Sequence, residues 1–189
     1  ALNYRSPTMT AEDYFSFMEA ASRQMNDPGL PIRMGTDEAL RTFSPPIFAA
    51  YCSRNGKSCI ERLAQYKRLI GPLIFLAAAQ GNRYSLEVAA EGGRQNIPSF
   101  LVEVEFVFLV HLLRSASKAP MIPLEVCFRD AFPKEAMADF FGCAPTRGEK
   151  NVLVFSMDDL ALPFISWNET MWDYFEPELR RRLSEMEID

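Results

Sequence analysis

The side chains with the greatest potential for chemistry interrupt an apolar segment that runs from Pro98 to Ser117. Glu103, Glu105 and His111 stand there among leucine, valine and phenylalanine residues. Because the segment is apolar on nearly all sides at helical spacing, it predicts a buried helix. The two glutamates are two positions apart and should therefore point to different sides of that helix. This spacing disfavours an acid/base mechanism that uses the two carboxylates as a pair.

His111 is the only histidine of the chain, so a Ser-His-Asp system would have to use it. No GxSxG, Walker or GxGxxG motif occurs anywhere in the sequence. A histidine inside an apolar helix is more often a hydrogen-bonded core or pocket residue than a catalytic base. We therefore predict that the protein is not an enzyme.

The four cysteines favour neither a metal site nor a disulfide. Cys52, Cys59, Cys127 and Cys143 form no CxxC pair. Together with the single histidine, this nearly excludes a zinc site of the usual Cys/His kind. Free thiols in a reducing cytoplasm are the simpler interpretation, and no cofactor is expected.

Charge and hydropathy limit the partners of the chain. Its 189 residues include 20 Lys and Arg against 25 Asp and Glu, which gives a net charge of -5. A DNA-binding domain normally has a basic face, so this segment is not expected to bind nucleic acid itself. The longest apolar stretch, Leu69 to Ala79, is too short to span a membrane and contains a Gly-Pro pair. No signal peptide is visible, and we expect a cytoplasmic protein with no membrane partner.

Hydrophobic periodicity predicts an α+β fold, in which a small, mainly antiparallel sheet packs against several helices. Helices are expected at 10–26, 44–55, 57–69, 98–117, 134–141 and from 166 onward, and strands at 73–79, 83–91, 122–129 and 151–156. In the helix at 57–69, the polar residues Arg62, Gln65 and Lys67 are expected to be exposed. Alternation in the strand at 122–129 places Ile122, Leu124, Val126 and Phe128 together on its covered side.

Several motifs between residues 122 and 164 occur in an order that resembles a known family. PLEVCFRDAFP, FFGCA and NVLVFSMDDLALP are similar to the effector-binding domain in one branch of the bacterial AraC-family transcriptional regulators. The resemblance extends back through DPGLPIRMG at 27–35 and CIERLAQYKRLIGPL at 59–73. It implies a sensor domain at 1–165 and a helix or connector at 166–189, followed in the family by a helix-turn-helix domain that this chain lacks.

A sensor of this kind needs a cavity between apolar layers, lined by a few polar groups. The polar residues that interrupt otherwise apolar elements are the candidates for contact with an effector: Arg83, Tyr84, Glu103, Glu105 and His111. Each of them also has a structural interpretation, as a snorkelling surface charge, a rim tyrosine or a satisfied core group. The resemblance transfers no ligand-contact residues, so the class of effector stays open.

The C-terminal segment has apolar residues at steps of three and four, which predict an amphipathic helix. These residues are Trp172, Phe175, Leu179, Leu183 and Met186. Ser166 and Glu169 have the spacing of a capping box, and Pro177 should kink or restart the helix. Two interpretations stay open: the helix covers its own domain, or it forms a dimerisation surface or the connector to the DNA-binding domain.

We therefore predict a ligand-sensing and dimerising regulatory domain. A small molecule would enter a pocket between the long apolar helix and the sheet and reposition the C-terminal helix. The expected partners are a small-molecule effector, a second copy of the chain, and DNA only through the absent domain. The alternative is a dimerisation scaffold without an effector, which a fully packed core with its aromatic rings in mutual contact would favour.

Overall fold

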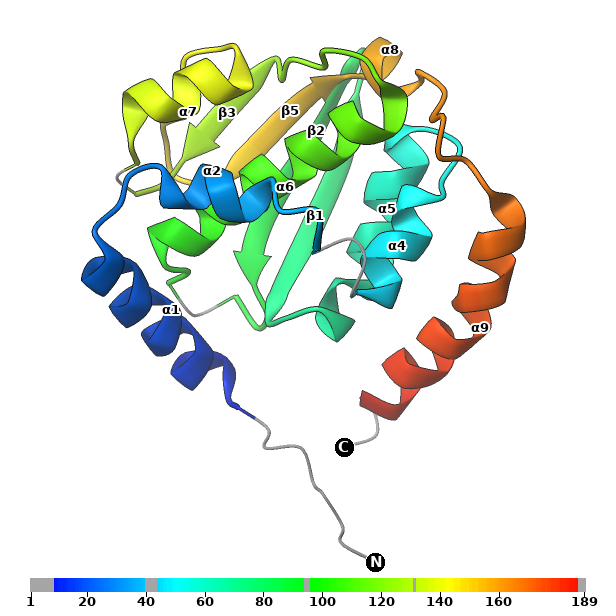
Figure 1. Cartoon of the computed structure of the whole chain (residues 1–189), viewed down its shortest axis with the longest axis horizontal. Helices are drawn as coiled ribbons and strands as arrows, with labels where there is room; N and C mark the ends of the chain where they lie inside the picture. Colours follow the sequence, from blue (N-terminus) through cyan, green and yellow to red (C-terminus); the bar gives the residue numbers. More distant parts are fainter. Residues whose placement is uncertain (1–8, 40–43, 94–95, 131, 187–189) are drawn as a thin grey trace, which may run out of the picture.

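A five-stranded sheet forms the frame of the protein, in a computed structural model that describes residues 9–39, 44–93, 96–130 and 132–186 (Figure 1). The strand order is β1 (Leu73–Gln80), β2 (Arg83–Ala90), β5 (Val152–Ser156), β3 (Glu125–Phe128) and β4 (Thr146–Arg147). All neighbours are antiparallel except β3 and β4. The α+β prediction with a mainly antiparallel sheet is confirmed.

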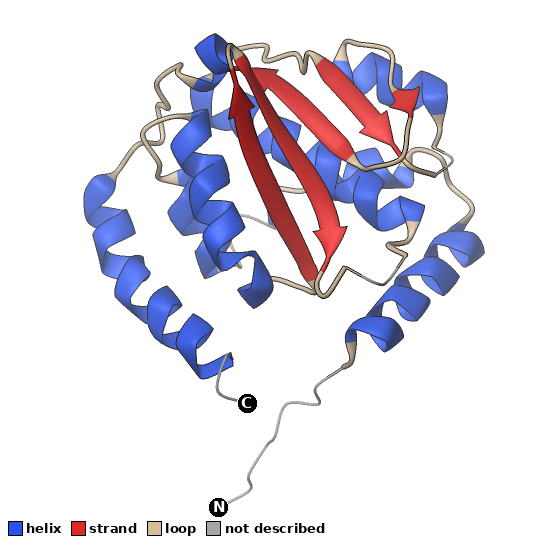
Figure 2. Ribbon diagram, turned by 180° about the vertical axis from the view of Figure 1, so that it is seen from behind, coloured by secondary structure: helices blue, strands red, loops and turns tan. Residues whose placement is uncertain are grey.

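Helices lie over one face of the sheet and beside it, so the strands are unobstructed when the molecule is seen from behind (Figure 2). In chain order they are α1 (Ala11–Met25), α2 (Leu30–Gly35), α4 (Pro45–Tyr51), α5 (Gly56–Tyr66), the 3-10 helix η1 (Lys67–Leu69), α6 (Ser99–Ser117), α7 (Lys134–Phe141), α8 (Met157–Leu160) and α9 (Glu169–Met186). Within the described ranges, no helix is both long and apolar enough to cross a membrane.

Local sequence signals explain where several of these elements begin and end. The Thr10 side chain accepts a hydrogen bond from the backbone N–H of Asp13 and so caps α1. Gly142 follows α7 with φ 77°, a left-handed conformation that glycine adopts without the steric cost that a side chain would bring. The two-residue turn between Gln80 and Arg83 closes the β1–β2 hairpin, and its Gly81 also has a positive φ.

The core lies between α6 and the covered face of the sheet. Phe106, Leu109 and Leu113 of α6 have no exposed surface. The ring of Phe106 lies 5.0 Å from that of Phe128 on β3, measured between centroids, and Phe128 in turn stacks on Phe132 at 4.7 Å. In this part of the structure, the space predicted to hold an effector between helix and sheet is occupied by side chains.

The packing of α2 against α6 is unusually close. A Cβ atom added to Gly35 would lie 2.6 Å from Cγ1 of Val107 and 2.9 Å from the backbone nitrogen of Phe108. Only glycine allows the backbone of α2 to approach α6 at this point. Hydrophobic periodicity does not predict α2, because a six-residue helix is too short to show a periodic pattern.

Several other local predictions were wrong. The strand β3 begins only at Glu125, although the N–H of Leu124 already donates to the carbonyl oxygen of Val154 on β5. The side chains of Ile122 and Leu124 are about half exposed and are not covered as predicted. The α9 helix is capped by the side chain of Asn168, which accepts from the N–H of Met171, instead of by Ser166. The Ser166 hydroxyl donates instead to the carbonyl oxygen of Tyr51.

Candidate functional site

An ion pair is buried where η1 meets α6. The ammonium nitrogen of Lys67 lies 2.7 Å from Oε1 of Glu105, and their side chains are only 4% and 14% exposed. Lys67 was predicted to be exposed at the end of a helix. It lies inside because α5 tightens into η1 and the chain then enters β1 within a few residues.

Aromatic rings border this ion pair. The Lys67 nitrogen lies 4.9 Å from the centroid of the Phe75 ring on β1, a distance at which the ring face attracts a cation. Burial raises the pKa of the half-buried Tyr14 on α1, and the charge of Glu105 raises this pKa further. We call Tyr14, Lys67, Phe75 and Glu105 the Lys67–Glu105 site.

One carboxylate oxygen in this site has no protein partner. Oε2 of Glu105 is buried and accepts no hydrogen bond from any part of the chain that the structure describes. An ionised oxygen that is buried without a donor carries a desolvation cost of about 1–3 kcal/mol or more. The site can therefore accept a hydrogen bond that the folded chain itself does not supply.

Glu103 lies two positions earlier on α6 and does not join this site. Its side chain is buried, and none of the described interactions gives it a hydrogen-bonding or ionic partner. Burial raises the pKa of Glu103 to about 7. The two glutamates thus have separate environments, as their spacing predicted.

The other candidates lie apart from one another. Arg83, at the exposed start of β2, donates to Oε2 of Glu125 at 2.8 Å. Tyr84 is buried on the covered face of the same strand. Burial raises the pKa of Tyr84, and the charge of Glu61 raises it further by a smaller amount. His111 is half-buried farther along α6. The structure therefore does not bring the five sequence-predicted residues together into one site.

The hollows found in the described part of the structure are not lined by Tyr14, Lys67, Phe75 or Glu105. One of about 480 Å³ is bordered by the start of α4, η1 and α9, with Pro45, Leu69 and Leu179 among its lining residues. Another, of about 670 Å³, lies between α1 and the residues that precede α6. Its lining includes the carboxylates of Glu12 and Asp130.

The α9 helix packs against its own domain. Leu179 is 1% exposed and forms a small cluster with Ala49 and Tyr66, around which Leu69 is also packed. Of the other predicted apolar residues of α9, those packed against this cluster are Trp172, Phe175 and Leu183. Met186 is 45% exposed.

Arg62 joins α5 to the start of α9. Its guanidinium carbon lies 3.7 Å from the centroid of the Trp172 ring, and it donates to Glu169 at 2.8 Å. With a side chain that is only 15% exposed, Arg62 is more buried than predicted. The first half of α9 is therefore fixed to the domain by both apolar packing and charge.

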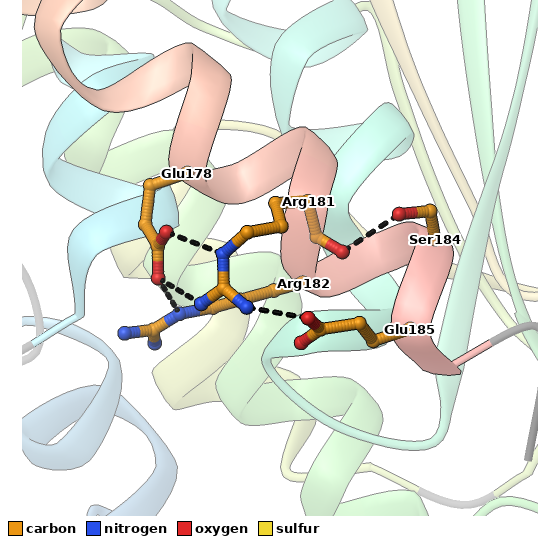
Figure 3. A network of polar contacts seen from close by, with 5 residues as sticks. All are labelled: Glu178, Arg181, Arg182, Ser184 and Glu185. Atoms are coloured by element: carbon orange, nitrogen blue, oxygen red, sulfur yellow. Dashed lines mark hydrogen bonds and ion pairs between the residues drawn. The ribbon is translucent and has the colours of Figure 1, made fainter.

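Charged residues on the far side of α9 form a network of their own (Figure 3). Glu178 accepts from both Arg181 and Arg182 at 2.8 Å, and Arg181 also donates to Glu185. These arginines lower the pKa of Glu178 to about 2. Glu178 and Arg182 are four positions apart, and both side chains are exposed to solvent.

The titratable groups do not form a metal centre in the part of the chain that the structure covers. No three His, Cys, Asp or Glu residues there could hold a metal ion together. All four cysteines are free, and complete burial raises the pKa of Cys59 to about 12, so this thiol is not a nucleophile at neutral pH.

The fold is similar to that of a solved transcriptional regulator. The crystal structure of the regulator CdpR from Pseudomonas aeruginosa superimposes with a TM-score of 0.63 at 10% sequence identity. The match covers 88% of this chain and 54% of the CdpR chain, so the chain spans about half the length of that neighbour. At this level of identity the likeness concerns the fold alone. No curated protein matches the sequence.

A family comparison covers most of the chain. The family model for the arabinose-binding domain at the N-terminus of AraC transcription regulators matches residues 2–164. This range includes all the motifs on which the resemblance was based. The family is a class of regulator domains and not of enzymes, which confirms the prediction against catalysis. The chain belongs to the family of N-terminal arabinose-binding domains of AraC transcription regulators.

Proposed function

We propose that this domain binds a small-molecule effector and dimerises, and that it thereby controls a helix-turn-helix DNA-binding domain attached after α9. The observation that carries the proposal is the buried Lys67–Glu105 pair with its free acceptor oxygen in an otherwise apolar interior. A buried ion pair contributes little to stability, because its desolvation cost offsets most of the attraction. A small molecule that completes the hydrogen bonding of the site would give the pair a functional role.

The site suggests the chemistry of the effector. A hydrogen-bond donor on the ligand would reach Oε2 of Glu105, and apolar or aromatic parts would lie against Phe75 and Tyr14. The ligand would thus combine a polar, donor-bearing group with an apolar body.

The position of Lys67 also suggests how binding is transmitted. Its neighbours Tyr66 and Leu69 belong to the cluster that holds Leu179 of α9. A ligand that draws Lys67 away from Glu105 would move η1, and with it the packing surface for α9. If the ligand has different affinities for the two arrangements, it shifts the position of α9 and of any domain that follows. In this proposal, residues 1–165 bind the ligand, and residues 166–189 connect them to the DNA-binding domain.

A thermal-shift screen of the native chain against a metabolite and fatty-acid library tests the sensing half of the proposal. A compound that raises the unfolding midpoint in proportion to its concentration is the expected result. Sedimentation velocity of the same sample tests dimerisation, and a concentration-dependent dimer is expected. A well-folded chain that no compound stabilises would contradict the sensing half.

One observation favours the second candidate, a dimerisation scaffold that needs no effector. The rings of Phe106, Phe132 and Phe141 each pack against the ring of Phe128 in the core. Such packing leaves no space for a ligand between α6 and β3. A dimer in sedimentation combined with no ligand-induced stabilisation would support this function over sensing.

A further inference from the structure

The outer edge of β1 is the least protected strand edge in the described structure. β1 is the first strand of the sheet and pairs only with β2. Its second half is exposed: Leu76 is 50% exposed, and Ala77, Ala78 and Ala79 are also open to solvent. Natural proteins usually protect such an edge with charges, proline or a bulge. β1 has none of these between Leu73 and Gln80, where its pairing with β2 is continuous.

The hairpin geometry shows which backbone groups point away from the sheet. Gln80 and Arg83 flank a two-residue turn and therefore form a hydrogen-bonded pair. Because such pairs alternate along antiparallel strands, the backbone groups of Gln80, Ala78 and every second residue before them bond to β2. Two hydrogen bonds agree with this alternation. The N–H of Glu91 donates to the carbonyl oxygen of Pro72. The N–H of Val88, the residue opposite Phe75, points away from β1 and donates to the carbonyl oxygen of Asn151.

The N–H and C=O groups of Phe75, Ala77 and Ala79 therefore point away from β2. Ala77 and Ala79 lie on the exposed half of the edge, whereas Phe75 is buried near its start, where α5 and η1 pack against β1. No described residue bonds to these backbone groups. The edge thus presents a regular row of unsatisfied donors and acceptors on an uncharged strand.

From this edge we infer that two copies of the chain pair β1 with β1 in antiparallel fashion, about a two-fold axis at Ala77, to form one continuous sheet. The inference rests on the proposed dimerisation and identifies its surface. In this register Ala77 faces Ala77 of the second copy, and the outward-pointing groups of Phe75 meet those of Ala79. On the uncovered face, Leu76 lies opposite Ala78, and the two Leu76 side chains are diagonal neighbours.

Charge favours a second copy as the occupant of this edge. Residues close to a two-fold axis lie near their own counterparts, so a charged strand centred on the axis would repel itself. The chain has a net charge of -5, yet β1 carries no charged residue. The nearest charges on the uncovered face are neutralised within one copy, in the pairs Arg83–Glu125 and Lys150–Glu87.

The architecture also stops assembly at two copies. Pairing through β1 uses up that edge in both partners. The opposite edge is β4, which has only two residues and offers little backbone for strand addition. The expected product is a closed dimer and not a fibre.

Disulfide trapping tests the register. In Ala77→Cys the two new thiols would face each other with Cα atoms about 5.5 Å apart, within the range of roughly 4.4–6.8 Å that a disulfide spans. Ala79→Cys is the matched control on the same exposed edge, because its counterpart would lie about 14 Å away along the strand. Under mild oxidation, Ala77→Cys should give a covalent dimer well above the background of the native cysteines, and Ala79→Cys should not.

Proline substitution tests the hydrogen bonds separately. Ala77→Pro removes an N–H that faces the open edge, so β1 can keep its pairing with β2 and the monomer should stay folded. Each copy loses one hydrogen bond across the two-fold axis, and the dimer dissociation constant should rise roughly tenfold or more. The helical surface control Ala20→Lys, on the exposed side of α1, should leave that constant unchanged.

The outcomes distinguish dimerisation itself from the β1 surface that we assign to it. A native chain that stays monomeric at all concentrations would overturn both dimerisation and the β1 surface. A native dimer in which Ala77→Cys does not cross-link, or cross-links no better than Ala79→Cys, would overturn only the β1 register. A dimer whose dissociation constant is unchanged by Ala77→Pro would do the same.

Discussion

The carboxyl group of Glu103 makes folding stability depend on pH in a way that one substitution can isolate. Glu103 is buried on α6 without a described partner, and its pKa is raised to about 7 from an ordinary value of 4.5. In the folded state the group therefore holds its proton over a pH range in which the unfolded chain has already lost it. Replacing Glu103 with glutamine removes this titration and keeps nearly the same shape.

The direction of this pH dependence follows from proton linkage. Between pH 4.5 and 7 the folded state binds more protons at Glu103 than the unfolded state, so the stabilising contribution is full below pH 4.5 and is lost as pH rises through 7. A shift from 4.5 to about 7 corresponds to a free energy on the order of 3 kcal/mol. Glu103→Gln should therefore match the native chain near pH 4.5 and exceed its stability by up to that amount at pH 8.

Chemical denaturation of both proteins at a series of pH values measures this difference. Because all other titrating groups are common to the two chains, subtracting their unfolding free energies leaves the contribution of Glu103. Glu135→Gln, at an exposed position on α7, is the control and should show no such rise. A difference between Glu103→Gln and the native chain that stays flat from pH 4.5 to 8 would refute the reasoning from burial.

Three further substitutions test the packing and the ion pair by denaturation. Lys67→Met should cost about 3–5 kcal/mol, because it leaves the Glu105 carboxylate buried without its cation. Gly35→Ala should cost about 1–3 kcal/mol, since the new Cβ would overlap Val107 and the α6 backbone. Leu179→Ala should cost about 2–5 kcal/mol if α9 is packed on its own domain as the structure shows.

Each of these predictions has a matched control. Adding Glu105→Leu to Lys67→Met should recover most of the lost stability, and a double variant no more stable than the single one would contradict the ion-pair account. Gly71→Ala should be nearly neutral, because nothing lies within 4 Å of its added Cβ. Met186→Ala, at an exposed position on α9, should change the unfolding free energy far less than Leu179→Ala.

Sequence periodicity predicted most of the fold. The hairpin of β1 and β2, the buried α6 helix and the boundaries of α7 were expected, because each has a strong pattern bounded by Gly, Pro or a capping residue. The short helix α2 and the late start of β3 were not expected. Both depend on tertiary packing: α2 on its close approach to α6, and β3 on the register with β5.

The candidate site was predicted only in part. Glu105 attracted attention as a charge in an apolar helix, but nothing in the sequence links it to Lys67, which is 38 positions earlier and looks like an ordinary surface lysine. Tyr14 lies on α1, more than 50 positions before Lys67, and nothing in the sequence links the two. Lys67 and Glu105 meet only because the fold brings η1 against α6, and no pattern within a single element reveals such a contact.

Ligand-dependent stabilisation, compared across three proteins, tests whether the effector binds at the Lys67–Glu105 site. The native chain, Glu105→Gln and the surface control Arg83→Gln would be titrated with a stabilising compound from the screen, and the unfolding midpoint of each would be followed. The account predicts a dose-dependent rise in the native chain and in Arg83→Gln, and a much smaller rise in Glu105→Gln. Equal stabilisation of all three proteins would contradict the assignment of the effector site to the Lys67–Glu105 pair.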